Sequence, residues 1–167
     1  MAQLDIQTEL HSTHPLDSVE QVMHEQGWRF KRDGDDEIAA EYRGQWCEYG
    51  LHFAWSKDID AVHFTCAFDM RVPAGKRGPV HELLALVNDR LWLGHFGIWH
   101  SEGMPMFRHA VLLRGASGLS SAQIEDLLDV AVFECERFYP AFQYVIWGGR
   151  PAPEAIDAAM IDPVGEA

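Results

Sequence analysis

The chain has 167 residues, of which 47% are hydrophobic and 23% charged, and its net charge is −13. This length, and this proportion of hydrophobic to charged residues, suit one globular domain over residues 1–167 and argue against global disorder. The negative charge argues against binding to nucleic-acid phosphates or to anionic lipid, since no cluster of lysine and arginine offsets it.

Residues 1–12 form a polar lead-in, and they lack the basic start and apolar run of a signal peptide. No stretch approaches the roughly 18 apolar residues that would span a bilayer. The three cysteines, Cys47, Cys66 and Cys135, are an odd and widely spaced set, which is not a disulfide framework. A reducing cytoplasm is therefore the expected location.

The first half of the chain predicts one helix followed by four strands. Residues 13–27 have helical spacing, with Pro15 in the first turn and Gly27 as the stop. Strands are expected at 28–32, 37–43, 46–55 and 61–72, with a turn at 33–36. In the last two strands large apolar residues alternate with polar or small ones, which indicates an antiparallel sheet with one dry and one wet face. The predicted dry face includes Cys47 and Cys66.

The second half predicts a helix from Gly78 to Leu93, a strand at 94–100, a turn at 101–104 and a strand at 106–115. A third helix begins after Ser120, whose pairing with Gln123 forms a capping box. Pro140 is expected to interrupt this helix, with a short helix at 141–147, a last helix at 152–160 and a tail at 161–167. The order α-β-β-β-β-α-β-β-α-α predicts an α+β fold with an antiparallel sheet packed by helices.

The sequence contains no pattern for a known catalytic or cofactor site. G-x-S-x-G and a phosphate loop are both absent, and thiols on a core face are protonated rather than activated. Among nine histidines, His52 and His63 fall on the wet face of neighbouring strands, where His95 or His109 could join them. These histidines could bind a metal, although no close helical pair supports that, or they could simply be solvated. No cofactor and no catalytic residue are predicted.

Aromatic residues are in surplus. The predicted helix 78–93 has a core stripe, and Leu86, Trp92 and Leu93 lie outside it. Trp99 belongs to a strand with bulky residues on both sides, and Trp46 falls outside the alternation. We therefore expect a subunit interface that includes Leu86, Trp92, Leu93, Trp99 and Trp46. Alternatively, the helices within 120–160 cover the same surface in one chain.

Several long stretches, among them WCEYGLHFAW, ELLALVNDRLWLGHF and ECERFYPAFQYVIWGGRPAPEAI, closely resemble the YbjN-type domain proteins of bacteria. The resemblance covers the chain from about Pro15 to the C-terminus. It implies a sensory transduction regulator with the α+β fold of type III secretion chaperones, which are small, acidic, dimeric and non-enzymatic. The resemblance implies no catalytic residue.

The sequence thus favours a non-catalytic regulator or chaperone-like protein, a homodimer that binds a protein or peptide and neither nucleic acid nor membrane. An extended peptide could lie along an apolar groove or a sheet edge, by analogy with secretion chaperones. The alternative is a small-molecule or metal sensor that uses His52, His63 and His109. A third hypothesis is an enzyme whose active site follows no familiar sequence pattern.

Overall fold

The computed structural model describes residues 14–161, so the predicted lead-in and nearly all of the tail lie outside the described residues. Its helices are α1 (Asp17–Glu25), α2 (Arg77–Asn88), α3 (Ser121–Ile146) and α4 (Ala152–Met160), and a short 3₁₀ helix, η1 (Ala74–Lys76), precedes α2. Its strands are β1 (Phe30–Asp33), β2 (Glu37–Arg43), β3 (Glu48–Ser56), β4 (Ala61–Ala67), β5 (His95–Trp99) and β6 (Met104–Leu112).

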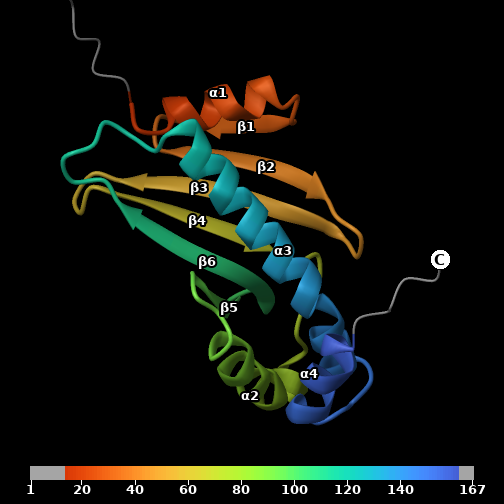
Figure 1. Ribbon diagram of the computed structural model, residues 1–167. Coiled ribbons are helices and arrows are strands. Elements are labelled where there is room, and N and C mark those ends of the chain that lie inside the picture. The colour runs from red at the N-terminus through yellow and green to blue at the C-terminus, as the bar shows by residue number, and fades with distance from the viewer. Residues whose placement is uncertain (1–13, 162–167) are drawn as a thin grey trace, which may run out of the picture.

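The strands form one six-stranded sheet in the order β1-β2-β3-β4-β6-β5, and each neighbouring pair is antiparallel. The chain leaves β4 through η1 and α2, returns as β5 at the far edge, and then places β6 against β4 (Figure 1). The predicted α+β class and the predicted order of elements are confirmed.

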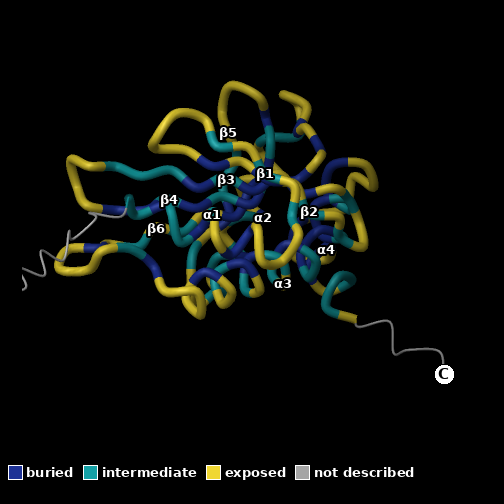
Figure 2. The backbone as a smooth tube through the Cα atoms, turned by 90° about the horizontal axis from the view of Figure 1, so that it is seen from above, coloured by how far each residue is buried: buried dark blue, intermediate teal, exposed yellow. Residues whose placement is uncertain are grey.

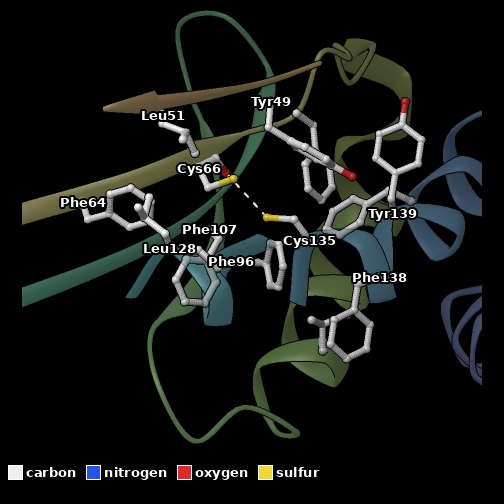
Figure 3. Close-up of a cluster of buried hydrophobic side chains, with 14 of the residues drawn as sticks. Tyr49, Leu51, Phe64, Cys66, Phe96, Phe107, Leu128, Cys135, Phe138 and Tyr139 are labelled. Carbon is white, nitrogen blue, oxygen red and sulfur yellow. Dashed lines mark hydrogen bonds between the residues drawn. The ribbon is translucent and has the colours of Figure 1, made fainter. Parts of the chain in front are cut away.

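The helices cover one face of this sheet and leave the other bare. Helix α3 crosses the sheet, and α2 and α4 pack together below it (Figures 1 and 2). The covered face presents Tyr49, Leu51, Phe53, Phe64 and Phe107, all 0–1% exposed. Against them α3 packs a buried stripe that includes Leu128, Cys135 and Phe138 (Figure 3). The period-two pattern therefore predicted the dry face correctly.

Helix α1 is attached to the β1 edge by ion pairs. The Arg32 guanidinium donates hydrogen bonds to Asp17 at 2.8 Å and to Glu20 at 2.7 Å, one turn further along the helix. The hydrogen bond from Arg32 lowers the pKa of Asp17 and outweighs the opposing effect of partial burial. This contact fixes α1 over the edge, with Val19, Val22 and Met23 buried beneath it.

The predicted break at Pro140 is wrong, because α3 continues through it to Ile146. A proline inside a helix removes one backbone hydrogen bond and crowds the preceding turn. Here Phe138 and Phe142 on either side of Pro140 are both fully buried. Their burial stabilises the helical turns on both sides of Pro140, so packing outweighs the local cost of the ring.

The predicted end of the second helix at Leu93 is also wrong, because α2 ends at Asn88. The Asn88 carboxamide accepts a hydrogen bond from the Phe96 amide at 2.6 Å and donates one to the Phe96 carbonyl at 3.0 Å. Gly94 then takes a left-handed conformation at φ +65°, where a Cβ would overlap the Phe107 ring. These contacts turn the chain into β5, so Trp92 and Leu93 lie in a loop rather than on a helix face.

Candidate functional site

The bare face of the sheet contains a wide hollow of about 860 Å³. Its floor consists of small residues on β2, β3 and β4, namely Ala39, Gly50 and Ala67. Trp99, Met104 and Met106 line it from β5 and β6, and Arg29 and Lys31 line it from the β1 side. Small side chains at its centre and long ones at both sides give the face its hollow shape.

Basic side chains cross this face in a single row. The strand register aligns His52 with Thr65, Thr65 with Arg108, and Arg108 with His95. Side chains directly opposite on neighbouring strands have Cβ atoms about 5 Å apart. His63 lies one row away, and its pKa is lowered by partial burial and by the nearby charges of Arg108, His52 and His95. The four basic groups therefore form one electrostatic cluster.

Carboxylates also border the hollow. Glu41, Glu48 and Asp69 line it, and Glu37 accepts a hydrogen bond from His52 with Nε2 and Oε2 3.1 Å apart. None of these carboxylates shares the transverse row of Thr65 and Arg108. Within residues 14–161, Arg108 forms no ion pair.

The expected grouping of His109 with His52 and His63 is wrong. His109 is paired with Phe64, so its side chain lies on the helix-covered face, whereas His52 and His63 lie on the bare face. Partial burial there lowers the pKa of His109. In the part of the chain that the structure describes, no three His, Cys, Asp or Glu residues come together as a set of metal ligands.

A second, smaller pocket of about 180 Å³ opens on the covered side, between β6 and the flank of α3. Its walls are mostly apolar, with polar groups at the rim, and include Leu93, Val111, Leu127, Val130, His109 and Asp126. Trp92, next to Leu93 in the chain, is 99% exposed. A fully exposed tryptophan therefore immediately precedes a residue that lines a mostly apolar pocket.

The structure spreads the predicted interface residues over several surfaces. Leu86 is partly buried against the core, whereas Trp92 and Leu93 project from the loop before β5. Trp99 belongs to the bare face. Trp46 stacks on Tyr139 of α3 with their ring planes 7° apart, and the Gln45 amide beside it donates a hydrogen bond to Glu136. Of these residues, Leu93 lines the smaller pocket and is preceded in the chain by the exposed Trp92, whereas Trp99 lines the larger hollow.

The sequence and the structure were compared with known protein families and solved structures. The model of a family described as "putative bacterial sensory transduction regulator" matches residues 15–144. The chain belongs to the YbjN family. Among solved structures, YbjN of E. coli, described as "a putative transcription regulator", is 12% identical, with a TM-score of 0.48 over 72% of this chain and 90% of that one. No curated protein matches the sequence.

Two further observations on this YbjN-family chain concern its helices and its cysteines. Within residues 14–161, no helix has both the length and the apolar character needed to cross a membrane. Cys66 and Cys135 are fully buried, and Cys47 is partly buried. Burial raises the pKa values of the Cys47 and Cys135 thiols, which keeps both thiols protonated and weakly nucleophilic.

Sequence reasoning missed Arg108 and Thr65 as members of the bare-face cluster, and it missed the pocket beside Trp92. Alternation alone places Thr65 on the wet face, but it does not align Thr65 with a residue 43 positions later in the chain. That alignment depends on β6 pairing with β4 rather than on any local pattern. A hairpin analysis of β5 and β6 could have found only the contact between Arg108 and His95.

Proposed function

We propose that this YbjN-family protein is a regulator that acts by binding proteins, and that its first partner is a second copy of itself. The observation that carries the proposal is Trp92, which is 99% exposed beside a pocket lined mostly by apolar groups. Tryptophan is one of the residues enriched among those that dominate binding energy at interfaces. An indole of this size buries roughly 150–250 Å² when it is covered, so leaving it in water is costly.

The arrangement of Trp92 and the pocket favours a second copy over an unrelated protein. Leu93 lines the pocket and directly follows Trp92, so the projecting group and the recess lie side by side on one surface. A two-fold axis through this surface would insert the Trp92 of each copy into the pocket of the other. Asp126 and Gln123 at the pocket lining supply oxygens that can accept the indole N–H.

The net charge of the chain affects how strongly two copies can associate. Two chains with a net charge of −13 each repel one another. A contact made through Trp92, Leu93, Leu127 and Val130 brings apolar groups together and keeps most carboxylates at its rim. The dimer should therefore become stronger with added salt, which screens the repulsion without weakening the apolar contact.

Light scattering coupled to size exclusion tests the proposal. The native protein should have twice the chain mass of 18.9 kDa, and Trp92→Glu should give folded monomers. Trp92→Phe should keep much of the dimer, because a smaller aromatic still fills the pocket. Trp147→Glu is the matched control, since Trp147 is another exposed tryptophan, 63% exposed, but caps the C-terminal end of α3.

A native monomer, or a Trp92→Glu protein that keeps its dimer mass, would overturn the proposal. Circular dichroism and the midpoint of thermal unfolding distinguish a folded monomer from a misfolded one. Because Trp92 contacts water rather than core, the substitution should leave the fold of each chain intact.

A further inference from the structure

The hollow on the bare face has the size and the polarity of a ligand site. Its volume of about 860 Å³ lies within the usual range for small-molecule sites, roughly 300–1,000 Å³. Such sites combine apolar walls with a few polar groups that orient the ligand. Here Trp99, Met104 and Met106 form the apolar wall, and His52 and Thr65 lie in the same hollow.

Arg108 borders the hollow without lining it: the strand register places it opposite Thr65, and Met106, two residues away on β6, belongs to the apolar wall. The Arg108 Cδ lies 4.0 Å from the position that a Cβ on Gly97 would occupy, so the side chain passes over Gly97 toward the row that contains Met106. Gly97, between His95 and Trp99, therefore allows the guanidinium to lie across β5. No carboxylate within residues 14–161 pairs with it, so its five N–H donors are available.

Basic groups beside one side of the hollow, in the row of Thr65, favour an anion there, away from the carboxylates that line other parts of it. Arg108, His52, His63 and His95 lie together in a protein whose net charge is −13. Lys31 continues the row at the β1 side through Ala39. A negative group bound between Arg108 and Thr65 would be attracted by the guanidinium and would meet no carboxylate in that row. A guanidinium binds the oxygens of carboxylates and phosphates in pairs, and the Thr65 hydroxyl can donate one more hydrogen bond.

We propose that this hollow binds a small amphipathic anion, whose carboxylate or phosphate contacts Arg108 and Thr65 and whose aromatic or aliphatic body packs on Trp99 and Met104. The site lies on the opposite face of the sheet from the pocket beside Trp92 and does not depend on the proposed dimer. It would supply this regulator with a chemical signal. Glu41, Glu48 and Asp69 lie at other positions of the hollow and would repel a second anionic group, so the ligand carries its charge at one end.

Three probes separate the contributions of charge and shape. Phenyl phosphate and benzoate carry the two oxyanions on the same ring, and benzyl alcohol is their neutral counterpart. Titrations followed by ¹H–¹⁵N spectra of the whole chain should show phenyl phosphate or benzoate shifting the amides of Gly50 and Gly97 and the indole signal of Trp99. Benzyl alcohol should shift them at least tenfold more weakly at equal concentration.

Two variants test the site without disturbing the fold. Arg108→Gln should weaken binding of the anionic probe at least tenfold, whereas Arg114→Gln, an exposed arginine outside the hollow, should leave it unchanged. Gly50→Val should abolish binding while keeping or raising thermal stability. A Cβ on Gly50 would meet only Ala67, at 4.0 Å, so the valine fills the floor without a clash.

The proposal is overturned if neither anionic probe binds, if Arg108→Gln binds as tightly as the native chain, or if the shifts gather around the pocket beside Trp92. It is also overturned if Arg108→Gln or Gly50→Val changes the mass in light scattering, because a second copy would then cover this face. Binding of only one of the two anionic probes supports the proposal and identifies the oxyanion.

Discussion

The covered and the bare faces of the sheet are built from alternate residues of the same strands, yet they are used in opposite ways. On β4 the covered face contributes Val62, Phe64 and Cys66, which are fully buried, and the bare face contributes His63, Thr65 and Ala67. Large apolar groups on one side hold the helices, and small or basic groups on the other leave a hollow. This contrast indicates that the packing that stabilises the fold lies mainly on the covered face.

The sharpest test of this contrast compares two neighbouring residues of β4. Phe64→Ala should destabilise the protein by about 3–5 kcal/mol, because it leaves a cavity beneath α3. Thr65→Ala should cost at most about 1 kcal/mol, since that side chain lies on the bare face and only strand preference is lost. Chemical denaturation of both variants measures the difference. Similar losses for the two would contradict the division of roles between the faces.

The next prediction concerns β5, the strand at one edge of the sheet. Asn88 occupies both the amide and the carbonyl of Phe96, which would otherwise be open to another strand. Asn88→Ala should therefore cost about 1–3 kcal/mol by leaving partly buried backbone groups without partners. It should also raise the tendency to aggregate through the exposed edge. Denaturation and time-resolved light scattering measure these two effects.

Asn88→Asp is the informative control for this edge, because a carboxylate can accept from the Phe96 amide but cannot donate to its carbonyl. Its loss of stability should fall between those of native protein and Asn88→Ala. An Asn88→Ala protein that is as stable and as soluble as the native chain would show that the carboxamide does not protect β5.

The smallest expected effect is a pH dependence that involves one histidine on each face. Burial lowers the pKa values of both His63 and His109 below the usual 6.5, with Arg108, His52 and His95 adding to the effect on His63, and His95 to that on His109. The unfolded chain therefore takes up protons first as the pH falls. The contribution of these two histidines to the free energy of unfolding is fully present above about pH 6.5. It is lost as the pH falls from there through their lower pKa values in the folded state.

Unfolding midpoints between pH 7.5 and 5 should accordingly decrease toward acid, and the slope should become smaller in His63→Asn and in His109→Asn. Phenyl phosphate, if it binds the bare face, should raise the midpoint of His109→Asn but not that of Arg108→Gln. A slope that is identical in native protein and both histidine variants would assign the acid sensitivity to other groups.

The sequence by itself determined the local features of this protein. Alternation in 46–55 and 61–72 predicted the buried set of Tyr49, Leu51, Phe53, Phe64 and Cys66, and Ser120 with Gln123 predicted the start of α3. The resemblance carried by several long stretches predicted the family. These features depend on residues close in the chain, or on strings long enough to be distinctive.

Only the tertiary structure decided where helices end and which distant residues meet. Pro140 remains within α3 because the buried neighbours of the proline outweigh one lost hydrogen bond, and α2 stops at Asn88 because its side chain binds β5 eight residues later. The alignment of Thr65 with Arg108, and the separation of His109 from His63, follow from the pairing of β4 with β6. Such pairing is set by the packing of the whole sheet, so no local pattern contains it.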